Sequence, residues 1–216
     1  MRSKLATPFC LGLILSLFSV LSPAQESKVI QLPPPQTDGG RPLMQVLKSR
    51  KSTREFGPQK LSPQTLSNLL WAAFGINRPD GHRTAPSAMN WQEVAIYVAT
   101  AEGVYVYDAQ SHAMKPVLAG DSRAATGTQD FVKDAAINLV YVADLSKTNH
   151  VSLADVLMYS SADVGFIAQN VYLYCASEGL ATVVRGSVDR PKLAKLLNLT
   201  PNQQIILAQS VGYPKN

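Results

Sequence analysis

The stretch from Ser152 to Gly179 constrains the fold of this chain more than any other feature of its sequence. Apolar residues occur almost all round a helical period, and Gly179 follows as a stop signal. The apolar positions are Val156, Leu157, Met158, Val164, Phe166, Ile167, Ala168, Val171, Leu173 and Ala176. A helix that is apolar on nearly every side must be buried on most of them. We therefore expect a helix that opens at Ser152 or Leu153, runs to Glu178, and lies inside the domain or in a subunit interface.

Shorter segments with strand or helix signals surround this helix and predict an α+β domain with a mixed central sheet flanked by helices. Ser62 is placed to cap a helix that starts at Pro63 and ends at Gly75. Residues 115–131 are expected to be loop with some helix. The other expected helices and strands, in chain order, span residues 42–48, 93–99, 104–107, 135–143, 180–184, 189–197 and 205–211.

Residues 1–24 have the pattern of a cleavable secretory signal. A positive start with Arg2 and Lys4 precedes an apolar run that is too short to span a membrane comfortably, and small residues follow it. An uncleaved membrane anchor is the alternative. We therefore expect an exported, periplasmic protein. Residues 25–41 are rich in Pro and Gly and are expected to form a linker outside the core, so that residues 42–216 make up the folded domain.

The composition excludes several classes of function. Of the 216 residues, 46% are hydrophobic and 16% are charged, which suits one globular domain with a real core. The net charge of +5 is mild, and the Lys and Arg residues form no run with interleaved aromatic residues of the kind that binds nucleic acid. His82, His112 and His150 show no metal-ligand spacing, so no metal site is expected. Cys175 is the only cysteine outside the leader, and we expect it to pack as a small hydrophobic residue.

A basic cluster at residues 50–54 is the first candidate for a binding site. Three cations and two hydroxyl side chains fall within five residues, in the order Arg-Lys-Ser-Thr-Arg. Guanidinium groups present planar forks of donors that match phosphate oxygens, and hydroxyls add neutral donors and acceptors. The cluster therefore fits a terminal phosphate or the carbonyl edge of a ring. A solvated basic turn is the alternative that the cluster alone leaves open.

Some residues of the long helix have both a structural and a functional interpretation. Asp163 is embedded in an apolar pattern and is expected to be a hydrogen-bonded buried carboxylate, with a place near an interface site as the alternative. Tyr159, Tyr172 and Tyr174 are more typical of packing than of catalysis.

Several motifs, taken in chain order, resemble the flavin-dependent nitroreductase family. The basic cluster continues into residues 55–56 as the family's opening basic-Ser-x-basic-x-Phe motif, and residues 86–92 match its Pro-Ser-x-x-Asn-x-Gln segment. Further similar segments are residues 61–75, 169–180, 183–186 and 211–214. The resemblance covers about residues 42–214. The hairpin at 104–108 is most similar to the branch that contains thiazoline/oxazoline (azoline) dehydrogenases.

The resemblance implies FMN, held non-covalently at the interface of an intertwined homodimer. The basic cluster would contact the FMN phosphate, ribityl chain and pyrimidine edge through Arg50, Ser52 and Arg54, with Lys51 as a weaker candidate. The flavin ring would be reached, largely from the partner subunit, by Pro86, Ser87 and Asn90. Its N5 and O4 edge would lie near Val184, Arg185 and Gly186. The flavin carries the redox chemistry, so no side chain is expected to be essential as a nucleophile or general base.

Two departures from the family pattern bear on function. Many members extend past the closing strand and supply a basic residue to the phosphate, and here Lys215 is the candidate replacement. Arg185 stands where several nitroreductases have an acidic residue. This changes the charge expected beside the ring and leaves NAD(P)H use open.

These features together predict an exported FMN-dependent oxidoreductase that transfers hydride or electrons between a donor and a small organic acceptor through flavin N5. NAD(P)H is scarce outside the cytoplasm, so the substrate itself is a second possible donor, as in azoline oxidation, with oxygen or a quinone as acceptor. The alternative is a non-catalytic flavin- or ligand-binding accessory protein of the cell envelope. A flavin-free structural role would leave Arg50, Ser52, Arg54 and Asn90 unexplained together.

Overall fold

The computed structural model describes residues 28–148 and 151–215. The expected secretory leader at residues 1–24, like His150, lies outside the described residues, and export stays a prediction. Within the described residues, no helix is both long enough and apolar enough to cross a membrane.

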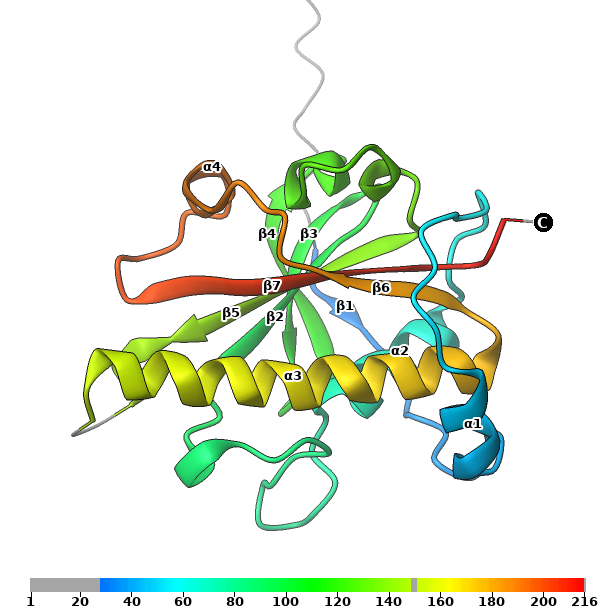
Figure 1. The fold of residues 1–216 in the computed structure, drawn as a ribbon, viewed down its shortest axis with the longest axis horizontal. Coiled ribbons are helices and arrows are strands. Elements are labelled where there is room, and N and C mark those ends of the chain that lie inside the picture. The colour runs from blue at the N-terminus through cyan, green and yellow to red at the C-terminus, as the bar shows by residue number, and fades with distance from the viewer. Residues whose placement is uncertain (1–27, 149–150, 216) are drawn as a thin grey trace, which may run out of the picture.

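In the part of the chain that the structure describes, a central sheet of seven strands organises the fold (Figure 1), with the strand order β1-β4-β3-β2-β5-β7-β6. The strands are β1 (Ile30–Gln31), β2 (Val94–Ala99), β3 (Gly103–Asp108), β4 (Ala113–Ala119), β5 (Ile137–Asp144), β6 (Ala181–Arg185) and β7 (Gln203–Gly212). The expected α+β class and the central sheet flanked by helices are confirmed. The pairing differs from the expected mixed sheet, because every pair of neighbouring described strands is antiparallel. The reason is that β7 inserts between β5 and β6, the two like-oriented strands that the long helix connects.

The described part of the chain also contains four α-helices: α1 (Leu43–Ser49), α2 (Pro63–Phe74), α3 (Leu153–Glu178) and α4 (Arg190–Leu196). The short 3₁₀ turns are η1 (Ala88–Asn90), η2 (Arg123–Thr126), η3 (Asp130–Lys133) and η4 (Leu145–Lys147). The expected caps are confirmed. The Ser62 side chain accepts a hydrogen bond from the backbone N–H of Thr65, and Gly179 ends α3 in the left-handed conformation at φ 71°.

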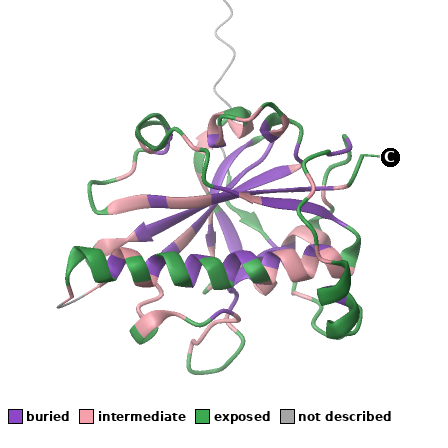
Figure 2. Ribbon diagram, viewed as in Figure 1, coloured by how far each residue is buried: buried purple, intermediate pink, exposed green. Residues whose placement is uncertain are grey.

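The main core lies between one face of the sheet and helices α2 and α3. Alternate residues of the same strands face the other side, where β2, β3, β5 and β7 pack against α4. Figure 2 shows the strands buried through most of their length while α3 alternates between buried and exposed positions. Leu153, Met158 and Phe166 of α3 are 60%, 55% and 47% exposed. The long helix is therefore buried along one side only within a single chain.

The N-terminal arm differs from the expected linker, because part of it belongs to the domain. Ile30 and Gln31 pair with β4, and Leu32 is buried in the main core. The Ser67 hydroxyl of α2 lies 2.6 Å from the Pro33 carbonyl oxygen and 2.7 Å from His112 Nε2. The arm is thus fastened between α2 and the β3–β4 hairpin rather than left outside the core.

Strand β4 is a second correction, because residues 115–131 were expected to be loop with some helix. Residues 115–119 of that stretch belong to β4, which pairs with β3, whereas residues 120–131 fit the expectation, with loop around η2 and the start of η3. Pro116 weakened the strand signal, since proline cannot donate to a ladder and occurs mainly at sheet edges. Here β4 has only the two-residue β1 on its outer side, which leaves room for Pro116.

Candidate functional site

The basic cluster leaves the end of α1 as an extended segment and is held between two strand ends. The Thr53 N–H donates to the Thr182 carbonyl of β6 at 2.9 Å. Two residues further on, the Glu55 carbonyl accepts from the Lys215 N–H at 3.3 Å, next to an isolated bridge between Phe56 and Pro214. These contacts fix the backbone while Lys51, Ser52 and Arg54 remain exposed. The cluster is therefore a positioned set of donors and not a free turn.

Tyr172 of α3 joins the basic cluster to β6. Its hydroxyl lies 2.8 Å from Ser52 Oγ and accepts a 2.9 Å hydrogen bond from the Val184 N–H. The Arg50 guanidinium lies over the Tyr172 ring, 5.2 Å from the centroid. Three residues that the resemblance assigns to the flavin site therefore meet at one side chain. Sequence reasoning assigned Tyr172 to packing, and its polar tip was the only signal of a further role.

A pocket of about 440 Å³ opens beside this junction. Tyr172 and Thr53 line it, together with three cationic residues, Arg41, Lys51 and Lys215, and one acid, Glu55. Several cations and one hydroxyl-rich wall suit a dianionic phosphate, which needs charge-assisted donors. Lys215 is thus placed near Lys51, as its suggested role at a phosphate requires.

The second predicted set, Pro86, Ser87 and Asn90, lies on the loop around η1. Three residues without glycine's freedom adopt positive φ there: Met89 at 50°, Asn90 at 54° and Gln92 at 47°. Such conformations are strained, and they persist where surrounding contacts hold them. Asn90 and Met89 are exposed, so the loop presents its tip outward.

Two buried acids hold the base of this loop, which we call the Ser87–Asn90 loop. The Ala88 N–H donates to Asp163 Oδ2 at 2.8 Å. Ser87 Oγ accepts from the Gln92 N–H at 2.9 Å and donates to Glu93 Oε2 at 3.3 Å. Asp163 is therefore a buried, hydrogen-bonded carboxylate, as expected. Sequence reasoning gave Glu93 no role, because it reads as the first residue of a strand.

Within one chain the loop and the basic cluster lie at different points along α3. Asp163 holds the loop and Tyr172 holds the cluster, and their nine-residue separation corresponds to about 14 Å along a helix axis. No hydrogen bond between described residues joins the two sets directly. This arrangement agrees with the expectation that the loop serves a partner's site, which stays a prediction.

Arg185 differs from the expectation that its charge lies beside a ring. Its guanidinium is buried and donates to the Thr126 carbonyl at 3.0 Å, to Asn138 Oδ1 at 3.1 Å and to Ser210 Oγ at 3.1 Å. Burial lowers the pKa of Arg185 to about 10. Side chains alternate along β6, so this guanidinium points away from the face on which Val184 meets Tyr172. Gly186, next along the chain, is exposed.

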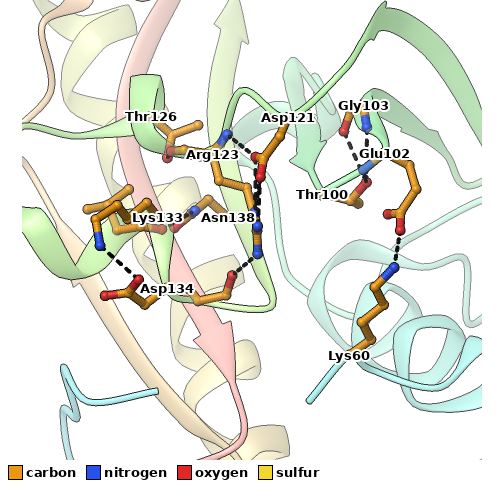
Figure 3. A network of polar contacts seen from close by, with 12 residues as sticks. Lys60, Thr100, Glu102, Gly103, Asp121, Arg123, Thr126, Lys133, Asp134 and Asn138 are labelled. Atoms are coloured by element: carbon orange, nitrogen blue, oxygen red, sulfur yellow. Dashed lines mark hydrogen bonds and ion pairs between the residues drawn. The ribbon is translucent and has the colours of Figure 1, made fainter. Parts of the chain in front are cut away.

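The segment that receives Arg185 is itself fastened by a polar network (Figure 3). Arg123 makes a two-pronged ion pair with Asp121 and donates to the Ala135 carbonyl at 2.8 Å. A pocket of about 580 Å³ lies nearby, between this network and the Lys60–Glu102 ion pair. Three of the cations that line this pocket, Lys60, Arg123 and Lys133, form ion pairs with nearby acids. The cations of the basic cluster form no ion pair among the described residues.

Other predicted features can be placed briefly. Cys175 is fully buried, as expected, and burial raises the pKa of its thiol. Among residues 28–148 and 151–215, no group of three or more His, Cys, Asp and Glu side chains could hold a metal ion.

Comparisons with known proteins agree on one family. The nitroreductase family model matches residues 47–213. A curated protein of Methanocaldococcus jannaschii, provisionally named a nitroreductase, is 34% identical over 167 residues, which span 73% of this chain and 84% of the relative. A crystal structure from Ralstonia eutropha JMP134, described in the same provisional way, has a TM-score of 0.85 and 42% identity and covers 89% of this chain and 92% of its own.

More distant structures share the fold. The microcin synthetase McbBCD complex of Escherichia coli, with truncated pro-MccB17 bound, matches with a TM-score of 0.66 and 21% identity, over 75% of this chain and 68% of that one. The NADPH:FMN oxidoreductase of Vibrio harveyi, complexed with NAD⁺, matches with a TM-score of 0.62 and 20% identity, over 81% and 69%.

Proposed function

The chain belongs to the nitroreductase family, and from this premise we propose that it is an FMN-dependent oxidoreductase acting on a small organic molecule. Membership supports a flavin oxidoreductase in general terms. The observation that carries the proposal for FMN is the junction at Tyr172, where Arg50, Ser52 and Val184 meet beside a cation-lined pocket. A binding site for a ring with a phosphate tail needs this combination of directed neutral groups and cations.

In this proposal each part of the junction has a distinct task. Lys51, Arg54 and Lys215 would hold the phosphate, while Arg50 and Ser52 would position the ribityl chain and the pyrimidine edge. A cation near the pyrimidine edge stabilises the negative charge that a reduced flavin carries. FMN, when bound, supplies the hydride and electron transfer. The residues of this chain bind and orient it, and no described side chain is assigned as a nucleophile.

A homodimer completes the proposed site. Leu153, Met158 and Phe166 are large apolar residues that α3 leaves exposed, and Met89 and Asn90 are exposed at the tip of the Ser87–Asn90 loop. Exposed apolar surface is typical of protein interfaces. A second copy of the chain would cover these residues and bring its loop to the first copy's flavin.

The choice of electron donor and acceptor depends on where the protein works and on the hairpin at β3. Arg185 was one of two reasons to expect an unusual donor, and its buried position removes that reason. The expected leader is the remaining reason, since NAD(P)H is scarce outside the cytoplasm. An azoline-type substrate rests on the similarity of the hairpin at β3, because the likeness to the McbBCD complex concerns the fold alone.

Absorption spectroscopy tests the cofactor directly. The purified protein, with and without added FMN, is passed through gel filtration and its visible spectrum is recorded. Flavin bands that remain with the protein support the proposal, and failure to retain added FMN refutes it. Titration with NADH then separates the donors, since rapid flavin bleaching at micromolar NADH removes the need for a special donor. A flavin that binds but is never reduced and reoxidised by any substrate would favour the accessory role.

A further inference from the structure

Glu93 and Asp163 are two acids buried together beneath the Ser87–Asn90 loop. Glu93 is 0% exposed and Asp163 is 2% exposed. Their carboxylates hold adjacent residues of one loop: Glu93, just before β2, accepts from the Ser87 hydroxyl at 3.3 Å, and Asp163, in the middle of α3, accepts from the Ala88 N–H at 2.8 Å. Two ionised carboxylates buried this close together repel each other strongly, so such a pair tends to retain a proton.

No cation compensates the pair in the described part of the chain. Neither acid takes part in any of the ion pairs found there. Two cations reach the neighbouring residue Gln92 instead: Arg83 donates to its side-chain oxygen at 2.7 Å and Lys147 donates to its carbonyl at 3.3 Å. The flanking Asp144 uses its own carboxylate to accept from Ser146. The hydrogen-bond partners of the two carboxylates among the described residues are therefore neutral, namely the Ser87 hydroxyl and the Ala88 N–H.

Buried polar atoms that lack hydrogen-bond partners also indicate that the pair of acids holds a proton. Glu93 Oε1 and Ser160 Oγ are buried without a partner among the described residues. Buried polar atoms are rarely left in this state, and each one costs free energy. A proton on Asp163 would turn that side chain into a donor toward the Glu93 carboxylate. The other Asp163 oxygen would still accept the Ala88 N–H.

We propose that Glu93 and Asp163 form a carboxyl pair that shares one proton, and that the protonated pair positions the Ser87–Asn90 loop. This inference rests on the proposed function where it concerns the flavin, because that loop carries the residues assigned to the ring. The pair itself needs no flavin to exist. Neither acid is assigned to touch substrate or cofactor, so both are positioning residues.

The direction of the pH effect follows from Asp163. Burial raises its pKa, and the neighbouring Glu93 acts in the same direction. A raised pKa gives stability that is fully present below the ordinary pKa of an aspartate and is lost as pH rises through the folded value. Loss of the shared proton leaves two adjacent carboxylates, which should displace the loop and weaken flavin binding.

The test compares the full-length protein with its Asp163→Asn variant. An amide copies the protonated acid, because it can donate to Glu93 and accept from Ala88. We expect the folding equilibrium constant of the wild type, relative to the variant, to fall as pH rises above about 4, by up to tenfold for each unit of pKa shift. Glu102→Gln is the control. Its hydrogen bond and ion pair with Lys60 lower the pKa of Glu102, so its relative effect should appear as pH falls.

Trp91 fluorescence provides a local readout of the pair. Its intensity would not change with pH if the two acids had only a structural role. The Trp91 ring packs edge-on against Tyr159, one turn from Asp163, with 5.9 Å between centroids. In a Trp71→Phe background, Trp91 fluorescence should titrate with pH in the wild type and stay flat in Asp163→Asn and in Glu93→Gln. If one variant fails to fold, the other variant and the wild-type titration still test the shared proton.

The outcomes separate this inference from the proposed function. A wild type and an Asp163→Asn variant with the same pH profile of stability and of Trp91 fluorescence would overturn the shared proton. Wild-type FMN affinity should fall as pH rises while the variant's stays constant, and equal slopes would overturn the positioning role. If the wild type binds no FMN at any pH, the proposed function fails, yet the stability and fluorescence profiles still test the pair.

Discussion

Replacing Tyr172 with phenylalanine tests the junction on which the flavin proposal rests. The substitution keeps the ring, and with it the contact to Arg50, but removes the hydroxyl that meets Ser52 and Val184. The Val184 N–H lies on the free edge of β6 and has no other recorded partner. A half-buried donor without a partner costs about 1–3 kcal/mol. The exposed Ser52 hydroxyl loses less, because water can replace its partner.

This loss should appear mainly in FMN affinity. If the flavin-bound state alone is destabilised by about 1–3 kcal/mol, the Kd for FMN rises roughly 5- to 150-fold, since each 1.4 kcal/mol is a factor of about ten. Quenching of flavin fluorescence on binding gives the Kd, and chemical unfolding of the flavin-free protein gives the stability. A double-mutant cycle with Ser52→Ala should show that the two changes are not additive.

Tyr174→Phe is the matched control on the same helix. Its hydroxyl makes a single long hydrogen bond of 3.3 Å to the Thr65 carbonyl, away from the basic cluster. We expect its FMN affinity to stay near that of the wild type. The reasoning is refuted if Tyr172→Phe binds FMN as tightly as the wild type, or if Tyr174→Phe weakens binding equally.

Three further predictions concern the arm, the buried guanidinium and the phosphate. Leu32→Ala should lower the unfolding free energy by about 2–5 kcal/mol in urea titrations, whereas the exposed Val29→Ala should change it by less than about 0.5 kcal/mol. A Cβ at Gly127 would overlap the guanidinium of Arg185, so Gly127→Ala should cost about 1–3 kcal/mol of stability, and an unchanged Tm would contradict this packing. Arg54→Gln should weaken FMN binding but leave riboflavin binding unchanged, and equal loss for both ligands would argue against a phosphate contact.

Much of the fold follows from local sequence signals. Ser62 and Gly179 set helix ends through their own side chain or backbone freedom, so those boundaries could be predicted. The arm and β4 could not, because their structure depends on distant partners. Leu32 is buried because it packs into the main core, where the arm is bonded to α2 and to the β3–β4 hairpin. Nothing within residues 25–41 indicates these partners.

The candidate site shows the same division. The basic cluster and the Pro-Ser-x-x-Asn-x-Gln segment are contiguous motifs, and the resemblance found both. Arg185 is part of a motif as well, but its side-chain direction depends on which face of β6 meets α3. Tyr172 and Glu93 belong to no motif. The role of Tyr172 arises from its contact with Ser52, 120 positions away, and that of Glu93 from its burial beneath a loop that Asp163 of the distant α3 also holds.

Helix α3 links these observations, because polar residues on its otherwise apolar inner face make the contacts that hold the candidate site. A helix buried on one side and apolar elsewhere has little reason to carry Ser160, Asp163 and the hydroxyl of Tyr172 on its inner face, since buried polar groups cost free energy unless they are paired. Asp163 holds the loop, and Tyr172 holds the basic cluster, about 14 Å further along the axis. A single rigid helix thus fixes the spacing between the residues that would bind one flavin and the loop that would serve another. A substitution that bends α3 between Asp163 and Tyr172 should therefore impair both sites of a dimer at once.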